Sequence, residues 1–150
     1  MYKNSEGYPD PTAAAAVSSM MREYKKKQRD EYRRKQTVKN RPKVYIASKY
    51  AGDIETNVKA AIEYSRYAIK RDRIPVTVHL LYPQILDDND PKQRELGMLF
   101  GQALLEICDE IWVCGTEHSP GMKQEIVEAK RLGKQIKYFN ERMEELHENG

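Results

Sequence analysis

Short apolar runs and helical stripes alternate along the chain from residue 44 onward. A β-prone run covers 44–48, and apolar residues then recur at helical spacing over 54–69. Pro75 closes this helical segment, and a second apolar run covers 76–81. The pattern therefore predicts a strand, a helix and a second strand in this order.

The same alternation continues through the second half of the chain. It predicts a loop over 82–92, a helix over 96–107, a third strand over 111–114, a helix over 121–132 and a fourth strand over 135–139. The loop holds two prolines and three aspartates, which favour turns, and Gly133 stops the last helix. We expect the residues after 139 to form a loose terminal turn.

Strands that alternate with helices indicate an α/β fold. We predict a Rossmann-like three-layer sandwich, with a mainly parallel sheet of four to five strands, right-handed crossovers and helices on both faces. In such sheets a ligand binds beyond the carboxyl ends of the strands. The loops after Ser48, Leu81 and Cys114 should therefore converge on one crevice.

A basic helix is predicted in front of this domain. Asp10 and Pro11 are typical of an N-cap followed by proline in the first turn. One apolar stripe follows, formed by Ala13, Val17, Met20, Met21 and Tyr24, and it fades where lysines and arginines accumulate over 25–35. We expect this second half to be a solvated or frayed helix, 37–42 to be a linker, and the chain to divide into an arm over 1–41 and a domain over 42–150.

The charge of the chain is divided between these two parts. The whole chain carries a formal charge of +3, but residues 1–41 hold 11 Lys and Arg against 5 Asp and Glu. Residues 42–150 hold 15 against 18, so the domain is slightly acidic. A basic arm can contact nucleic acid or an acidic partner, and the alternative is a plain solvated helical face.

Composition excludes several classes of protein. With 39% hydrophobic and 33% charged residues, the 150-residue chain has enough apolar side chains for one folded core. No apolar run approaches the length of a membrane span, so we expect a cytoplasmic protein. Cys108 and Cys114 are the only cysteines, too few for a disulfide framework and without the tightly spaced ligands of a zinc site.

The segment from Ser119 to Glu125 carries the clearest chemical signal. Ser119, Pro120 and Gly121 form the turn into a predicted helix, where a hydroxyl and free amides can hold an anion. Glu125 follows about one and a half turns later, on the side that would face a sugar bound there. The alternative is that Ser119 is a simple N-cap and Glu125 a solvated acid.

Further candidates lie at the other predicted strand ends. Tyr45, Ser48 and Lys49 belong to the first strand or follow it, and His79 falls in the second. Tyr50 is a candidate for stacking on a nucleobase, whereas we expect the aromatic ring at 112 to pack in the core of the parallel sheet.

Several motifs together resemble the nucleoside 2-deoxyribosyltransferase-like superfamily over residues 43–139. They are, in order, Val44-Tyr45-Ile46-Ala47-Ser48, Gly52-Asp53, His79, Cys108-Asp109-Glu110-Ile111-Trp112-Val113, and Ser119-Pro120-Gly121-Met122-Lys123-Gln124-Glu125-Ile126. That superfamily contains deoxyribosyltransferases, which exchange nucleobases, and nucleoside 5'-monophosphate N-hydrolases, which release them. The resemblance implies a nucleoside or nucleotide ligand and no cofactor.

The resemblance also assigns roles to residues. Glu125 matches the glutamate that attacks the anomeric carbon and forms a glycosyl ester, and Tyr45 matches the tyrosine that orients it. Ser119 matches a serine that the N-hydrolases use on phosphate, and His79 matches a histidine of the same enzymes. The remaining ligand-binding residues that we predict are Ser48, Lys49, Tyr50, Asp53, Gly121 and Met122.

One position departs from the pattern of the active enzymes. An aspartate that helps to protonate the departing base is replaced here by Gly101, and a general acid contributes a factor of about 10² to 10⁴ in rate. A carboxylate at Asp87, Asp88, Asp90 or Asp109 can take its place, or the pocket has kept binding and lost turnover.

The resemblance leads to two functions and a context. The chain either cleaves or transfers the N-glycosidic bond of a nucleotide, or it sequesters a nucleotide without altering it. Residues 6–13 resemble the start of short phage and mobile-element proteins, which implies that the protein acts in a bacterial host. Members of the superfamily are commonly homo-oligomers, and the Ala13–Tyr24 stripe is a candidate contact.

Overall fold

The computed structural model of the protein describes Gly7 and residues 11–147. The chain divides into two compact units, residues 1–40 and residues 41–150. Within the described ranges, no helix is both long enough and apolar enough to cross a membrane. The N-cap predicted at Asp10 lies outside the described residues.

The first unit is a single helix, α1, which spans Pro11–Lys39 and has no buried residue. It is regular to its end, where the Thr37 hydroxyl donates a hydrogen bond to the Arg33 carbonyl oxygen and the Asn40 amide bonds to Gln36. The helix thus continues through the first half of the predicted linker. No glycine or proline interrupts this stretch before Pro42, so nothing in its backbone chemistry ends the helix earlier.

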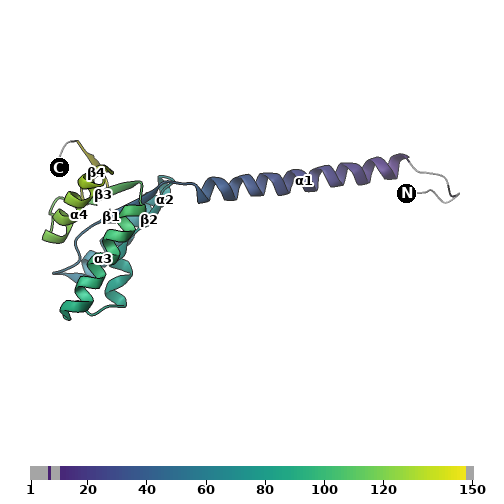
Figure 1. The fold of residues 1–150 in the computed structure, drawn as a ribbon. Coiled ribbons are helices and arrows are strands. Elements are labelled where there is room, and N and C mark those ends of the chain that lie inside the picture. Colours follow the sequence, from purple (N-terminus) through teal and green to yellow (C-terminus); the bar gives the residue numbers. More distant parts are fainter. Residues whose placement is uncertain (1–6, 8–10, 148–150) are drawn as a thin grey trace. The chain divides into compact units, whose positions relative to one another are not determined.

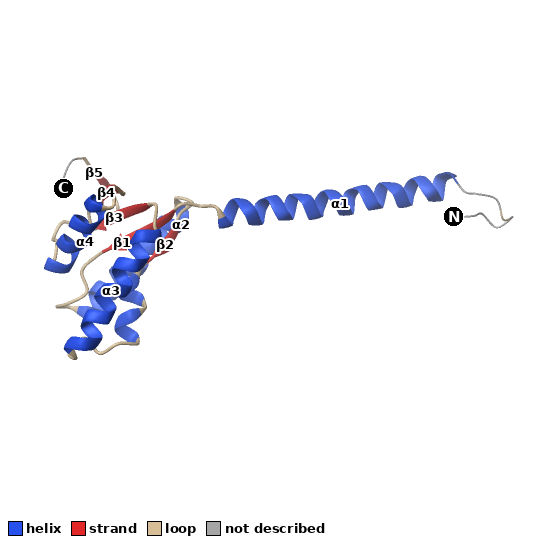
Figure 2. Ribbon diagram, viewed as in Figure 1, coloured by secondary structure: helices blue, strands red, loops and turns tan. Residues whose placement is uncertain are grey.

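The second unit is an α/β sandwich around one five-stranded sheet (Figures 1 and 2). Its elements are β1 (Lys43–Ala47), α2 (Ile54–Lys70), β2 (Ile74–Val76), α3 (Pro91–Ile107), β3 (Glu110–Cys114), α4 (Pro120–Arg131), β4 (Gln135–Phe139) and β5 (Glu145–Leu146). The strand order is β2-β1-β3-β4-β5, and only β5 is antiparallel to its neighbour. The predicted fold class is confirmed.

Successive side chains of each strand point to opposite faces of the sheet and build two separate cores. On one face, α2 packs against a cluster that includes Ile46, Trp112 and Phe139. On the other face, α3 and α4 pack against a cluster that includes Tyr45, Leu105 and Ile126. The sheet therefore lies between α2 and the pair α3 and α4, as a three-layer sandwich.

The second strand and the C-terminal residues differ from their prediction. The strand β2 begins before Pro75 and ends at Val76, and residues 78–80 and 82–84 form two 3-10 turns. Proline is accommodated because β2 is an edge strand, where its missing amide costs no ladder hydrogen bond. At the other edge, Glu145–Leu146 pairs with β4 as a fifth strand instead of a loose turn.

The strand order places a crevice at the carboxyl ends of β1 and β3. From β1 the chain crosses to β2 on one side and then to β3 on the other, so the connections leave these two central strands in opposite directions. Ligands of open α/β sheets bind at this kind of switch point. Helix α4 begins beyond β3 and therefore delivers its first turns to the crevice.

Candidate functional site

A tyrosine of the central strand meets a glutamate of α4 in this crevice. Tyr45 is 2% exposed, and its hydroxyl donates a hydrogen bond to the Glu125 carboxylate. The second carboxylate oxygen, Glu125 Oε2, is buried and has no hydrogen-bond partner within the described part of the chain. The phenol thus orients a carboxyl group that lines the cavity.

Burial controls the acidity of both groups. Loss of solvent raises the pKa of Glu125 from 4.5 to about 7, although the hydrogen bond from Tyr45 acts in the opposite direction. Burial, together with the charge and the hydrogen bond of Glu125, raises the pKa of Tyr45 well above 10. Near neutral pH, therefore, the phenol keeps its proton and the carboxyl group exchanges between its acid and its carboxylate form.

The N-terminus of α4 forms one wall of the site. Ser119 is the N-cap, and its hydroxyl oxygen accepts a hydrogen bond of 3.2 Å from the Met122 amide. Ser119, Gly121 and Met122 all line the cavity that contains Glu125. The capping role weighed for Ser119 is therefore present, and its hydroxyl proton remains available to a ligand.

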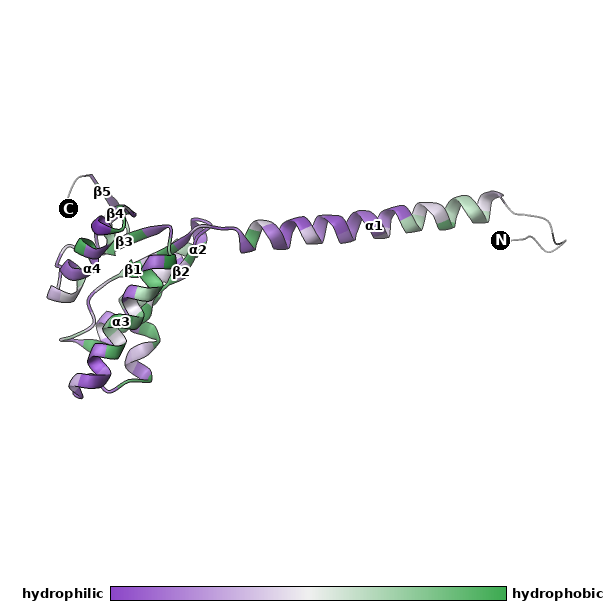
Figure 3. Ribbon diagram, viewed as in Figure 1, coloured by the Kyte–Doolittle hydropathy of each residue, from purple (hydrophilic) through white to green (hydrophobic). Residues whose placement is uncertain are grey.

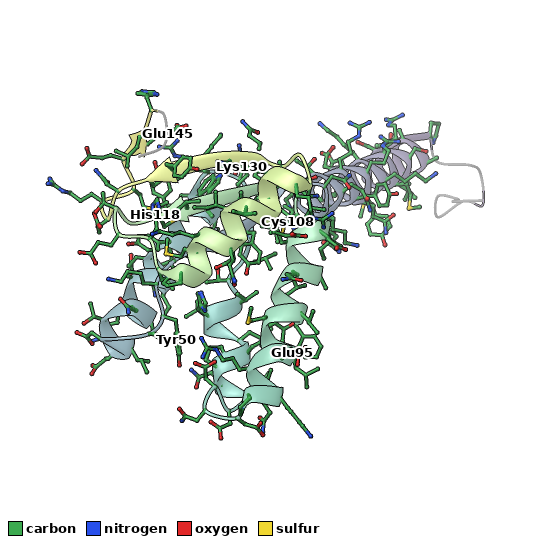
Figure 4. The ribbon with its side chains drawn as sticks, turned by 60° about the vertical axis from the view of Figure 1, so that its left-hand side comes forward. Tyr50, Glu95, Cys108, His118, Lys130 and Glu145 are labelled. Carbon is green, nitrogen blue, oxygen red and sulfur yellow. The ribbon has the colours of Figure 1, made fainter. Side chains whose placement is uncertain are left out.

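An aromatic pair forms a second wall. The rings of Tyr50 and His79 are stacked, with centroids 5.6 Å apart and planes 13° from parallel, and both line the cavity. Burial lowers the pKa of His79 below its usual value, and its hydrogen bond to the Ser48 carbonyl oxygen and the charge of Asp88 only partly offset this effect. Figure 4 shows the position of Tyr50 among the side chains. The lowered pKa of His79 favours its uncharged ring at neutral pH.

Helix α3 forms the third wall with its backbone. Gly97 and Gly101 lie one turn apart on the face toward the cavity. A Cβ atom built on Gly101 would lie 3.3 Å from the Tyr45 hydroxyl oxygen, which is tighter than ordinary contact. Glycine at 101 therefore allows α3 to approach the phenol that holds Glu125.

Together these walls enclose a cavity of about 520 Å³, within the range of small-molecule sites. Apolar side chains such as Val78, Leu86 and Met98 supply much of its lining. Two ion pairs lie at the cavity. Asp88 lies 4.0 Å from Arg94, and Glu128 is paired with Arg131. The arrangement suits a ligand with a flat apolar part and a few polar groups.

Three predicted ligand residues lie outside the cavity lining. Ser48 directly follows β1 and is buried, and its hydroxyl has no hydrogen-bond partner within the described residues. Lys49 pairs with Glu117 at 2.6 Å. Asp53 is exposed and caps α2 by accepting a hydrogen bond from the Thr56 amide. The other predicted residues, Tyr45, Tyr50, His79, Ser119, Gly121, Met122 and Glu125, line the cavity together.

Of the four aspartates considered as replacements for the acid missing at 101, only Asp88 lines the cavity. Asp87 accepts a hydrogen bond from the Asn89 amide within the loop, and Asp90 caps α3. Asp109 accepts from the Lys43 amide, at the start of β1 and so at the other end of the sheet.

Sequence reasoning missed much of the wall that α3 and α4 contribute. The residues not anticipated include Arg94, Gly97, Gln102, Gln124 and Glu128. Helical spacing carried a usable signal, because Arg94, Gly97 and Gly101 follow one another at three and four residues. Glu128 likewise follows Glu125 by three.

No group of three or more His, Cys, Asp or Glu residues that could hold a metal ion occurs among the described residues. Cys108 and Cys114 are both free thiols and both buried. Burial raises the pKa of Cys108 to about 11 and raises the pKa of Cys114 even further. Both side chains act as small apolar groups of the two cores.

Residues 42–139 match the model of a protein family described as "Domain of unknown function (DUF7768)". The matched segment runs from just before β1 to the end of β4 and so includes every wall of the cavity. None of the curated proteins compared with the chain matches its sequence.

Solved structures also resemble part of the chain. A 2-deoxyribosyltransferase from Bacillus psychrosaccharolyticus has a TM-score of 0.56 and 14% identity, over 65% of this chain and 72% of that one. A 2-deoxyribosyltransferase from Leishmania mexicana has 0.46 and 17%, over 66% and 64%. A CMP N-glycosidase from Clostridium botulinum has 0.43 and 19%, over 65% and 71%. The first of these likenesses shows that the chain has a nucleoside 2-deoxyribosyltransferase-like fold.

Proposed function

We propose that this protein, which belongs to the DUF7768 family, binds a nucleoside or a nucleotide in the cavity beside Glu125 and cleaves or transfers its N-glycosidic bond. The 2-deoxyribosyltransferase fold supports the ligand class. The chemistry rests on one observation: the half-buried Glu125 carboxyl group lines the cavity and is hydrogen-bonded by the Tyr45 hydroxyl.

The proposed reaction uses a carboxylate oxygen of Glu125 as the nucleophile. It bonds to the anomeric carbon of the sugar while the bond from that carbon to the base nitrogen breaks and its electron pair passes to the base, which takes up a proton. Water or a second base then attacks the same carbon, releases a proton and frees the Glu125 carboxylate. Tyr45 is a positioning residue, because its hydroxyl hydrogen-bonds the Glu125 carboxyl group.

A nucleoside 5'-monophosphate is the ligand form we favour. The phosphate would accept hydrogen bonds from the Ser119 hydroxyl and the Gly121 amide, at the positive end of α4. The base would stack on the pair formed by Tyr50 and His79, whose rings are nearly parallel. The sugar then lies between these two ends, next to Glu125.

The test is release of free base from a panel of nucleosides, 2'-deoxynucleosides and their 5'-monophosphates, followed by chromatography. Wild-type protein should release base from at least one compound, and Glu125→Gln, which keeps the shape of the side chain, should not. The rate should increase as pH rises through about 7, because the nucleophile is the carboxylate form. No release across the panel, or equal release by both proteins, would remove the catalytic part of the proposal.

A second candidate is a nucleotide-sequestering protein, of the kind that a phage or mobile element would use in its host's cytoplasm. Gly101 favours it, because the backbone of α3 stands against Tyr45 where the active enzymes are expected to carry an acid. Calorimetry with mononucleotides and cyclic nucleotides, followed by recovery of the ligand after heat denaturation, separates the candidates. A ligand recovered intact supports sequestration, and a free base supports catalysis.

We also propose that the protein forms homo-oligomers through the outer face of α3. The exposed residues of that face are Leu96, Leu99, Phe100, Ala103 and Ile107, and the four large ones are between 41% and 60% exposed. A self-complementary stripe of this kind suits a twofold contact between two copies. Leu99→Glu should lower the mass measured by light scattering to that of a monomer, whereas Val127→Glu, at an isolated exposed valine of α4, should not.

A further inference from the structure

Helix α1 carries a stripe of five cations on one face. The stripe consists of Arg22, Lys25, Lys26, Arg29 and Arg33, all of them exposed. At about 100° per residue these five side chains fall within an arc of about 100°, because they follow one another at helical spacing. They extend over about 16 Å of the helix axis at 1.5 Å per residue.

These cations have no acidic partner of their own. Among the described residues, the only ion pair within α1 joins Lys35 to Glu31, on the other side of the helix. Residues 11–39 hold 9 Lys and Arg against 3 Asp and Glu. The three acids, Glu23, Asp30 and Glu31, all lie outside the arc of the stripe. The stripe is therefore a concentrated and uncompensated positive surface.

Apolar residues do not accompany the stripe along the helix. They concentrate in the first half of α1, where Figure 3 shows the pale and green segment, and the second half is hydrophilic. Between 22 and 33 the opposite side of the helix carries Tyr24, Lys27, Gln28 and Glu31. A helix that lies on a membrane needs a continuous apolar face opposite its cations, and this segment does not have one.

We propose that the Arg22–Arg33 stripe binds the phosphate backbone of duplex nucleic acid. A duplex carries one negative charge per about 1.7 Å, so a stripe of about 16 Å passes several phosphates at once. A single α-helix with its side chains has a diameter of about 10 to 12 Å, so it also fits the major groove, which is about 12 Å wide. Contacts of this kind are made to phosphate and not to base edges, so the binding has little sequence preference.

This function is separate from the cavity of the second unit. The stripe belongs to residues 1–40 and the cavity to residues 41–150, and no residue contributes to both. The basic helix would hold the protein on nucleic acid, while the domain binds its small ligand. Loss of either function should leave the other intact.

The test compares two triple variants of the full chain that lose the same charge. Arg22→Gln, Lys26→Gln and Arg29→Gln remove three cations from the stripe, and Lys27→Gln, Arg34→Gln and Lys35→Gln remove three from the other faces. Glutamine has nearly the helix propensity of lysine and arginine, so circular dichroism should show equal helicity in all three proteins. Fluorescence anisotropy then measures binding of a labelled duplex and of a single strand of the same sequence, from 50 to 300 mM salt.

The stripe variant should bind the duplex at least about tenfold more weakly than wild type, and its slope of log affinity against log salt should fall by about 2 to 3. The control variant should keep most of the affinity for the duplex and most of its dependence on salt. Equal loss in the two variants, preference for the single strand, or binding to vesicles of anionic phospholipid in place of duplex would each overturn the proposal. The duplex result does not depend on nucleotide binding, since Glu125→Gln should bind the duplex as wild type does.

Discussion

The two faces of the sheet differ in how their helices cover them. On the α2 face, the rings of Trp112 and Phe139 lie 4.8 Å apart and Tyr67 of α2 packs edge-on against both. On the opposite face, α3 presents Gly97 and Gly101, and a cavity of about 520 Å³ remains. Large aromatic rings fill the space between the sheet and α2, and we call this side the closed face. Glycines of α3 leave space beside the sheet on the other side, which we call the open face. The same sheet therefore supports a packed core and a binding site.

The largest effect should come from the closed face. Trp112→Ala removes the central ring of the aromatic cluster and should lower the free energy of unfolding by about 3 to 5 kcal/mol. It also removes the indole hydrogen bond of 3.1 Å to Glu110. Met98→Ala, at an exposed residue of the cavity wall, should cost less than about 1 kcal/mol. Urea titration measures both, and similar losses would mean that the two faces are packed alike.

The next effect concerns the open face and depends on pH. The raised pKa of Glu125 means that folding favours the protonated carboxyl group, so this contribution is complete below pH 4.5 and is lost as pH rises through about 7. Glu125→Gln has no proton to lose. Its stability relative to wild type should therefore increase by up to about 3 kcal/mol between pH 5 and pH 8.

Chemical denaturation at several pH values measures this difference. Gln124→Ala, next to Glu125 in α4 and without a titrating group, serves as the control, and its difference from wild type should not change over the same range. A flat difference for Glu125→Gln would show that water reaches the carboxylate freely, and the distinction between the closed and the open face would then weaken.

The pattern of apolar residues was sufficient to predict the strands and helices, but not the cavity between the sheet and α3. Periodicity located β4 at residues 135–139 and placed α2 correctly to within one residue. It could not show that α3 approaches Tyr45, because that contact is made by a backbone without a side chain at Gly101. Patterns report side chains, whereas this part of the cavity wall is formed by the backbone of α3.

Local motifs predicted individual residues better than they predicted their neighbours in space. The turn from Ser119 to Glu125 lies at the cavity because its spacing is fixed by one helix. Lys49 and Asp53 are in the loop after β1, whose path the sequence does not determine, and they bind to Glu117 and Thr56 instead. Residues within one element share a geometry, whereas residues of a loop depend on the whole fold.

A smaller effect should follow from adding a side chain at Gly101, where the backbone of α3 approaches Tyr45. Gly101→Ala adds a methyl group 3.3 Å from the Tyr45 hydroxyl oxygen. The gain in helix propensity, about 1 kcal/mol, should roughly offset the crowding, so the overall stability should change little. The displaced phenol should hold Glu125 less well and raise its pKa further, since the Tyr45 hydrogen bond lowers it.

An infrared or nuclear magnetic resonance titration of the Glu125 carboxyl group checks this change. Gly133→Ala is not a suitable control, because Gly133 has a positive φ of 69° and would be strained. Ala103→Gly, on the outer face of α3, changes helix propensity without contacting Tyr45. An unchanged pKa in Gly101→Ala would mean that α3 does not constrain the phenol.

The last prediction separates the two roles of Ser119. Ser119→Ala removes the N-cap hydrogen bond to the Met122 amide and should cost about 1 kcal/mol of stability. Ser119→Asp keeps a capping oxygen, so its stability should be close to wild type, but it places a negative charge where a phosphate is proposed to bind. Both variants should therefore bind a nucleoside 5'-monophosphate more weakly, although only one of them is destabilised. If Ser119→Asp binds the monophosphate as well as wild type, the hydroxyl acts only as a cap, and the open face recognises its ligand through the sugar and the base.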